Sequence, residues 1–261
     1  MLLTVDIGNT SITLGIFYGD ALVEEFRLAS DRDLSQAEYE VLLKTLLKSF
    51  KIEGCIIASV VEELNSKFKF ALENVLGISP MFLTHEINMG VKIVSDTPQE
   101  AGADRIANAC AAFMLYKKPC IVVDFGTATS FDIVNKKGEF VGGIIAPGLN
   151  LQMNVLNKFT SKLPKIEVAI SNCAIGKTTQ DAILSGVIRG SAAMIDGLVE
   201  QCEKELGQKA VIIATGGYSG LISSYMKRPF DFINPTLTLE GLRFLYNLNQ
   251  PSNIPAIQAD M

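Results

Sequence analysis

The chain has 261 residues, of which 48% are hydrophobic and 20% are charged. This is the balance of a globular protein with an ordered core, and it excludes a disordered chain. The 23 Lys and Arg residues against 28 Asp and Glu residues give a formal net charge of -5. Because no run of basic residues is present to neutralise phosphates, we expect no nucleic-acid partner.

The cysteines and the N-terminus indicate a cellular compartment. The five cysteines are widely spaced, form no Cys-x-x-Cys pair, and have only His85 to complete a zinc set. We therefore expect free thiols in a reducing compartment. The N-terminal residues reach Asp6 before a secretory apolar segment develops, and no apolar run approaches the roughly 18 residues of a membrane span. We expect a cytoplasmic protein that does not enter a membrane.

A short segment near the N-terminus is repeated near the midpoint of the chain. Val5-Asp6-Ile7-Gly8-Asn9-Thr10 returns as Val123-Asp124-Phe125-Gly126-Thr127-Ala128. Each copy ends an apolar strand, and a second strand follows at 12–17 in the first copy and at 130–134 in the second. Turn residues follow both second strands. The echo predicts two similar halves, each beginning with a β-meander.

The rest of the first half alternates helices with strands. Ser35 and Glu38 form a predicted capping box, and the apolar residues behind them have helical spacing, so this helix should pack on a sheet. The apolar face comprises Tyr39, Leu42, Leu43, Leu46, Leu47 and Phe50. A strand at 55–61, a helix from Glu62 to a C-cap at Gly77, and a short strand at 81–84 follow. This alternation is typical of an α/β sheet.

The second half contains a long predicted helix at 180–206. Gly186 and Gly190 interrupt its apolar stripe, and each interior glycine costs roughly 1 kcal/mol relative to alanine. Their presence indicates a close approach of another backbone, either across a dimer interface or within a tightly packed chain. From Gln250 onward the sequence is aperiodic and predicts a loose tail.

The first Asp-x-Gly copy has the composition of a phosphate-binding loop. Gly8 allows the backbone to approach a phosphate, while Asn9, Thr10 and Ser11 offer donors to its oxygens. Asp6 can hold Mg²⁺ through water. A simple hairpin turn is the structural alternative for one copy, and the second copy weakens it.

The second copy again places a carboxylate, a glycine and hydroxyls at a strand end. Two such loops facing each other would clamp the β- and γ-phosphates of a nucleotide, an arrangement that resembles the actin, sugar-kinase and Hsp70 superfamily. The segment Val211-Ile212-Ile213-Ala214-Thr215-Gly216-Gly217 fits as a third element, which in that superfamily lies against the adenosine. A P-loop is excluded at Ile175-Gly176-Lys177-Thr178, because Ser171 stands where that motif needs glycine.

A candidate catalytic carboxylate begins a predicted helix in Gly102-Ala103-Asp104-Arg105. Asp104 falls in the first helical turn, where a carboxylate also stabilises the helix N-terminus without any catalytic role. The functional interpretation is that Asp104 takes the proton of a substrate hydroxyl as it attacks a γ-phosphate, with Arg105 nearby to bind an anion. Because the chain has a single histidine, it offers only one residue around which a Ser-His-Asp triad could form.

The ordered set of motifs resembles type III pantothenate kinases and covers residues 6 to 217. It consists of Asp6-Ile7-Gly8-Asn9-Thr10, Gly102-Ala103-Asp104-Arg105, Asp124-Phe125-Gly126-Thr127-Ala128-Thr129, Gly142-Gly143-Ile144-Ile145-Ala146-Pro147-Gly148 and Thr215-Gly216-Gly217. The resemblance implies an α/β fold of two similar actin-like (ribonuclease H-like) domains, each a mixed β-sheet with flanking helices, with the nucleotide in the cleft between them. We expect domains at 1–115 and 116–249 and a tail at 250–261.

The resemblance also implies an activity, namely ATP-dependent phosphorylation of pantothenate to 4'-phosphopantothenate, the first step of coenzyme A biosynthesis. Asp104 matches the general base and Asp124 the ligand of a monovalent cation, K⁺ or NH₄⁺, which acts with Mg²⁺. The matching ATP-binding residues are Asp6, Ile7, Gly8, Asn9, Thr10, Ser11, Ile12, Thr13 and Thr127. The matching pantothenate-binding residues are Gly102, Ala103, Asp104, Arg105 and Thr179.

Family members are usually homodimers, and many carry a tyrosine in the segment where this chain has Ser95-Asp96-Thr97-Pro98. Ser95 is therefore not expected to contact the substrate as tyrosine would. Two alternatives stay open. One is another small-molecule kinase or phosphatase of the same superfamily, and the other is an actin-like protein that uses ATP to control assembly.

Overall fold

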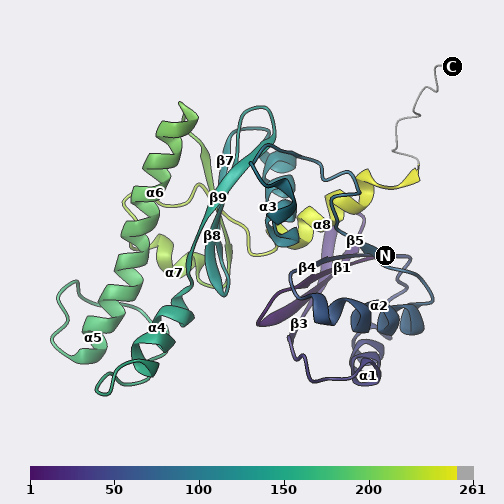
Figure 1. Ribbon diagram of the computed structural model, residues 1–261, viewed down its shortest axis with the longest axis horizontal. Helices are drawn as coiled ribbons and strands as arrows, with labels where there is room; N and C mark the ends of the chain where they lie inside the picture. The colour runs from purple at the N-terminus through teal and green to yellow at the C-terminus, as the bar shows by residue number, and fades with distance from the viewer. Residues whose placement is uncertain (252–261) are drawn as a thin grey trace. The chain divides into compact units, whose positions relative to one another are not determined.

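The structure is a computed structural model that describes residues 1–251 and divides into two compact units. The first unit comprises residues 1–92, 96–114 and the C-terminal segment from Leu237, and the second comprises 93–95 and 115–236 (Figure 1). The sequence placed 116–249 in one domain, whereas the helix after Leu237 lies in the first unit. Of the predicted tail, all but residues 250 and 251 lies outside the described residues.

The first unit is built on a five-stranded mixed sheet in the order β3-β2-β1-β4-β5. Its strands β1 to β3 form the predicted antiparallel meander, and β4 and β5 then add in parallel. The strands are β1 (Leu2–Ile7), β2 (Ser11–Tyr18), β3 (Ala21–Ala29), β4 (Gly54–Ser59) and β5 (Met81–Phe82).

Helices α1 (Gln36–Leu47) and α2 (Glu62–Leu76) pack together on one face of this sheet. The predicted capping box of Ser35 and Glu38 begins α1, and Gly77 ends α2 with a φ of +70°. The predicted apolar face of α1 is wrong at Leu42, which is 37% exposed, because the buried stripe runs through Tyr39, Leu43 and Leu47.

Helix α8 (Leu237–Leu248) covers the other face of the first sheet. A β-carbon at Gly15 would lie 2.9 Å from Leu239, so this glycine lets the helix approach the strands closely. Helix α3 (Ala103–Tyr116) packs against α8, where a side chain at Gly241 would collide with the Ala107 carbonyl. The contact places the beginning of α3 on a rigid support.

The second unit repeats this plan in a six-stranded sheet of order β11-β10-β7-β8-β9-β6. Strands β7 to β9 form an antiparallel meander, and β10 and β11 add in parallel on the other side of β7. The duplication predicted from the echo is therefore confirmed. The strands are β6 (Lys92–Ile93), β7 (Cys120–Phe125), β8 (Ala128–Val134), β9 (Glu139–Pro147), β10 (Val211–Gly216) and β11 (Phe232–Ile233).

One face of the second sheet is covered by helices α4 (Leu149–Lys158), α5 (Thr179–Leu184), α6 (Gly190–Leu206) and α7 (Ser219–Ser223) (Figure 1). The helix predicted at 180–206 is present as α5 and α6, joined by a π-helical turn at Ser185–Arg189. Side chains at Gly186 and Gly190 would meet open space. Tight packing within the chain is thus the wrong explanation for these glycines, and the dimer interface stays a prediction.

The continuous helix Thr179–Leu206 also meets the length and composition of a membrane span, with a mean hydropathy of 1.4. The sequence alone predicts no apolar run of this length. Core helices of globular proteins meet the same two criteria, and 44% of its apolar window is buried. The five cysteines are free as expected, and burial raises the pKa of Cys120 to about 12.

Candidate active site

The first Asp-x-Gly loop joins β1 to β2 and is fastened by polar groups. The backbone N–H of Gly8 donates to the Ser11 carbonyl at 3.0 Å, which closes the turn. The Ser30 hydroxyl donates to the Gly8 carbonyl, and Arg32 Nη2 donates to Asn9 Oδ1 at 3.1 Å. The loop is therefore held from outside by β3 and the residues that follow it, with Asn9 and Thr10 exposed.

The predicted nucleotide-binding residues of this loop divide into two sets. The half-buried Asp6 shares its sheet face with Thr13, its partner in the β1–β2 register. The side chains of Ile7 and Ile12 are fully buried in the core, so they can offer a nucleotide only their backbone groups. The polar side chains available at this strand end are those of Asp6, Asn9, Thr10, Ser11 and Thr13.

The second Asp-x-Gly loop joins β7 to β8 and is fastened by backbone. The N–H of Gly126 donates to the Ala128 carbonyl at 3.0 Å, and the N–H of Gly148 donates to the Thr127 carbonyl at 3.2 Å. A side chain at Gly148 would collide with the carbonyls of this loop. Thr127 itself is exposed at the turn.

Asp124 lies among oxygen-bearing side chains. Its register partners are Ser130 on β8 and Thr215 on β10, so the three side chains share one face of the sheet. A β-carbon at Gly126 would lie 3.9 Å from Asp124 Oδ1, which shows that the carboxylate leans toward the loop. A carboxylate with neighbouring hydroxyls is a donor set that suits a hard cation.

The Thr-Gly-Gly turn ends β10 directly beside this loop. Gly216 has a φ of +83°, a left-handed conformation that glycine adopts without strain. A β-carbon there would lie 2.6 Å from the Phe125 carbonyl oxygen. Gly216 is therefore required both by its conformation and by the close approach of β7.

Asp104 begins α3 next to a glycine that leaves room for its carboxylate. The N–H of Arg105 donates to Asp104 Oδ1 at 2.8 Å, which fixes the orientation of the side chain. A β-carbon at Gly102 would lie only 2.6 Å from the same oxygen. The Gly102 carbonyl accepts the first helical hydrogen bond, from Ile106, at 3.0 Å. Gly102, Asp104 and Arg105 thus lie together at the start of α3.

Burial raises the pKa of Asp104 above its ordinary value, although the Arg105 N–H and the Arg105 charge partly oppose the shift. A carboxylate that is desolvated and holds its proton more tightly is a stronger base once it is ionised. A buried carboxyl with a perturbed pKa is a pattern typical of functional sites.

A cavity of about 370 Å³ borders the segment that leads into α3. It is lined by residues 99–103 and by side chains of α2, among which Asn65 has a buried carbonyl oxygen, Oδ1, with no hydrogen-bond partner in the described part of the chain. Such an atom can accept a hydrogen bond from a ligand at little cost. Sequence reasoning missed Asn65, because a polar residue within a helix is ordinarily a solvated one.

Thr179 lies in the second unit, as the first residue of α5. Its neighbour Thr178 caps the helix, accepting a hydrogen bond from the Asp181 N–H at 3.1 Å. Thr179 is exposed and lines an apolar groove of about 710 Å³ with side chains of α4 and α5. Leu151 and Val155 of this groove are each 43% exposed, so their apolar surface is open in the single chain.

Within residues 1–251, no group of three or more His, Cys, Asp or Glu side chains gathers to hold a metal ion. His85 is exposed after β5 and lines the cavity beside Asn65. Ser95 follows β6 and is half-buried.

Sequence comparisons give a consistent result. The profile of the type III pantothenate kinase family matches residues 2–201. A type III pantothenate kinase of Dehalococcoides mccartyi strain CBDB1 is 44% identical over 95% of this chain and 96% of the relative. The Moorella thermoacetica enzyme of the same description is 40% identical over 95% of this chain and all of the relative.

Solved structures share the fold at lower identity. A protein described as a Baf family transcriptional activator from Campylobacter jejuni superposes with a TM-score of 0.60 at 22% identity, over 95% of this chain and 98% of the other. The activator of a 2-hydroxyisocaproyl-CoA dehydratase from Clostridium difficile gives 0.53 at 9% identity, over 96% of each chain. The predicted actin-like α/β fold is thereby confirmed.

Proposed function

The chain belongs to the type III pantothenate kinase family, and we propose that it transfers the γ-phosphoryl group of ATP to the terminal hydroxyl of pantothenate. The product is 4'-phosphopantothenate, and the reaction begins coenzyme A biosynthesis. The observation that carries this proposal is identity of 44% with a named family enzyme over nearly the whole chain. We place the enzyme in the cytoplasm, where ATP is supplied and free thiols persist.

We propose that Asp104 is the general base. Its carboxylate accepts the proton of the pantothenate hydroxyl while the hydroxyl oxygen forms a bond to the γ-phosphorus and the bond from that phosphorus to the bridging oxygen breaks, releasing ADP. Burial and the hydrogen bond from the Arg105 N–H support this role, because they keep the carboxylate basic and oriented. Positioning supplies most of the remaining rate in phosphoryl transfer.

We propose that both Asp-x-Gly loops bind the phosphates of ATP. The first offers the side chains of Asn9, Thr10 and Ser11, and the second offers Thr127 and its backbone N–H groups. Mg²⁺, when bound to the nucleotide, supplies charge neutralisation, and Asp6 is placed to hold one of its waters. Asp124, with Ser130 and Thr215 on the same face, is the proposed ligand of a monovalent cation, K⁺ or NH₄⁺.

We propose that pantothenate binds at Gly102 to Arg105, with Thr179 as a further contact. The unpartnered Asn65 oxygen in the adjoining cavity supports a substrate with hydroxyl and amide N–H donors, which pantothenate has. The Arg105 guanidinium offers a partner for an anionic group of the substrate. Ser95 is not assigned a contact.

We also propose that the enzyme is a homodimer. The apolar groove between α4 and α5 supports this, because its exposed Leu151 and Val155 side chains are the kind of apolar surface that a second copy covers. Gly186 in this groove would let another backbone come close. Sedimentation of the purified protein at several concentrations measures the dimer directly.

The decisive experiment is an assay of ADP release by the purified protein with ATP, Mg²⁺ and a panel of acceptors, with and without K⁺. Turnover should depend on pantothenate and rise with K⁺, with little turnover on sugars or acetate. Turnover on another acceptor alone would replace the proposal with a different kinase. ATP-dependent polymer in the pellet without acceptor-dependent turnover would indicate an assembly protein instead.

A further inference from the structure

The segment between α4 and α5, residues 159–178, is long and lacks helices and strands. A segment of this length without regular structure is uncommon in a compact unit, and holding it in one conformation carries a large entropy cost. It leads directly into Thr178 and Thr179. Whatever fixes this segment therefore also fixes the first turn of α5.

Ser171 is the buried anchor of the segment, with 3% of its surface exposed. Arg189 Nε donates to the Ser171 hydroxyl at 3.2 Å, and Arg189 Nη2 donates to the Ser171 carbonyl at 3.0 Å. The Tyr225 hydroxyl accepts from the Ser171 N–H at 2.9 Å and donates to its carbonyl at 3.2 Å. Every polar group of Ser171 is thus bonded to one of two side chains from elsewhere in the unit.

Arg189 and Tyr225 also hold each other. The guanidinium carbon lies 4.9 Å from the centre of the Tyr225 ring, in a cation–π contact. A planar guanidinium can donate in two directions while stacking on a ring, which lysine cannot do. We name the set of Ser171, Arg189 and Tyr225 the loop latch.

Two further contacts carry the constraint from the loop latch toward Thr179. The Ser185 hydroxyl donates to the Ala174 carbonyl at 2.6 Å. Gly176 lies so close to α5 that a β-carbon would lie 2.6 Å from Ala182 Cα. Over most of the stretch from Ser171 to Thr178, the segment consequently packs against the helix that follows it.

The π-helical turn Ser185–Arg189 is part of the same arrangement. It contains Ser185 at one end and Arg189 at the other, and both bond the preceding segment, at Ala174 and at Ser171. A π-turn accommodates an extra residue in the helix and is frequently found at functional sites. In this chain the π-turn lies where the long helix bonds the preceding segment.

We propose that Arg189 is a positioning residue for pantothenate: through the loop latch it holds the segment 159–178, and thereby the orientation of Thr179 at the start of α5. This inference rests on the proposed function for its substrate. The loop latch touches none of the proposed ATP-binding residues in the contacts described. Loosening it should therefore weaken the use of pantothenate while leaving the use of ATP intact.

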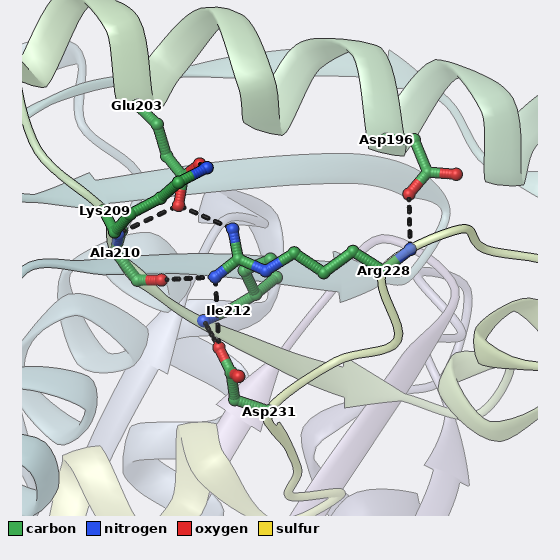
Figure 2. A network of polar contacts seen from close by, with 7 residues as sticks. All are labelled: Asp196, Glu203, Lys209, Ala210, Ile212, Arg228 and Asp231. Carbon is green, nitrogen blue, oxygen red and sulfur yellow. Dashed lines mark hydrogen bonds and ion pairs between the residues drawn. The ribbon is translucent and has the colours of Figure 1, made fainter.

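A second arginine of the same unit provides a matched control. Figure 2 shows Arg228, whose guanidinium pairs with Glu203 Oε1 at 2.7 Å and donates to the Ala210 carbonyl at 3.0 Å. This network joins α6 to the start of β10, and within residues 1–251 none of the hydrogen bonds or ion pairs of Arg228 reaches the segment 159–178. The Arg228 guanidinium makes three contacts, with Glu203, Asp231 and the Ala210 carbonyl, and the Arg189 guanidinium also makes three, so Arg228→Met removes a matched number of contacts and none of the bonds of the loop latch.

The first measurement follows the loop latch itself, by limited trypsin digestion. Lys162 and Lys165 are exposed within the segment, so cleavage after them reports its release. We expect Arg189→Met and Arg189→Lys to be cleaved there roughly tenfold faster than wild type, the ratio expected for losing hydrogen bonds from a charged group. Arg228→Met should show no such selective increase. Unchanged cleavage in both Arg189 variants would overturn the proposal.

The second measurement follows the substrate. Arg189→Met should raise the KM for pantothenate roughly tenfold, leaving the KM for ATP within twofold, whereas Arg228→Met should leave both unchanged. Tyr225→Phe, which keeps the ring but removes the hydroxyl, should give a smaller rise. Combined with Arg189→Met, it should be less than additive, because both side chains act through Ser171. Faster cleavage with an unchanged pantothenate KM would overturn the positioning role.

These two readouts separate this inference from the proposed function. If wild type fails to phosphorylate pantothenate, the proposed function fails while the digestion result still reports the loop latch. If Arg189→Met does not fold, Tyr225→Phe carries the test. Equal rises in the KM for ATP and for pantothenate would mean that Arg189 has only a structural role, and they would contradict the inference.

Discussion

The two units arrange their strands alike but secure their Asp-x-Gly loops differently. The order β3-β2-β1-β4-β5 in the first corresponds to β9-β8-β7-β10-β11 in the second. In the first, Ser30 and Arg32 hold the loop through side chains. In the second, Gly148 and Gly216 hold it through backbone contact. One framework thus tolerates both a loop fixed by replaceable side chains and a loop fixed by positions that only glycine can occupy.

The units also differ in what they add to the shared sheet. The first adds the Asp104 carboxylate at the start of α3, and the second adds the segment 149–206 between β9 and β10. Since the common strands carry the paired loops and the additions carry the proposed base and Thr179, we expect variants in the two regions to fail in different ways. The predictions below run from the largest expected effect on activity to the smallest.

The largest effect is expected for Asp104→Asn. Asparagine keeps the shape of the side chain but cannot accept the hydroxyl proton, so kcat should fall by roughly 10² to 10⁴. ATP binding, measured by calorimetry, should be unchanged. A variant that retains turnover within a few-fold of wild type would remove Asp104 from the mechanism.

The pH dependence of kcat, compared between wild type and Asp104→Asn, tests the same role more sharply. Because burial raises the pKa of Asp104, wild-type kcat should rise with pH through a value above the ordinary aspartate pKa of about 3.9, and the variant should lack this limb. Stability changes with pH in the opposite direction to kcat. The folded state holds the proton more tightly, so wild type loses stability relative to Asp104→Asn as pH rises from the unfolded to the folded pKa.

Next in size is the contrast between the two loop carboxylates. Asp124→Asn should raise the K⁺ concentration needed for half-maximal activity by roughly 10- to 100-fold, since it removes the negative charge of the carboxylate at the proposed site. Asp6→Asn should instead raise the Mg²⁺ requirement and leave the K⁺ response alone. Titrating each ion at a fixed level of the other distinguishes them. Identical responses in the two variants would mean that the loops do not divide these roles.

A smaller effect is expected for Gly102→Ala. The added methyl group would push the Asp104 carboxylate from its place, and a displacement of about 1 Å can cost up to roughly 10²-fold in kcat. The end of a side chain can rotate away, so the melting temperature should hardly change. Gly197→Ala is the control, because its β-carbon meets open space within a helix. Equal kcat values for both variants would contradict the tight fit at Gly102.

The smallest effect on activity is expected for Arg228→Met. Glu203 is only 5% exposed, and burial disfavours its ionised form, yet bonds from Lys209, Arg228 and the Ala210 N–H hold its pKa below the ordinary value. Because the Arg228 side chain is 39% exposed and Glu203 keeps its bonds from Lys209 and the Ala210 N–H, removing the arginine should cost only about 1 kcal/mol of unfolding free energy, measured in urea, with kcat unchanged. Wild-type stability from this group is present above the unfolded pKa and disappears as pH falls through the folded pKa, so the variant should respond less to acid.

Local patterns predicted much of this fold. The echo of Asp6 and Gly8 at Asp124 and Gly126 revealed the duplication, because a buried strand followed by a glycine turn has the same composition wherever it occurs. The capping box at Ser35 and the glycine at Gly77 marked helix ends for similarly local reasons. The family resemblance rested on these same local motifs.

Long-range packing could not be predicted in the same way. Helix α8 joins the first unit because Leu239 meets Gly15 and Gly241 meets Ala107, contacts that leave no trace in spacing. The π-turn is a change in hydrogen-bond register that the apolar periodicity of 180–206 hides. Asn65 and Arg189 resemble solvated helical residues in sequence, and only their surroundings show an unpartnered oxygen and a buried anchor.

The π-turn has one consequence for how this helix tolerates change in length. A π-turn holds one residue more than the α-helical turn it replaces, so deleting one residue from 185–189 would restore an unbroken α-helix while the turns on either side keep their facing. Thr179 and the core contacts of α6 would then keep their direction around the helix axis. What such a deletion would remove is the placement of Ser185 and Arg189 toward the preceding segment, so it should release that segment without unfolding the helix.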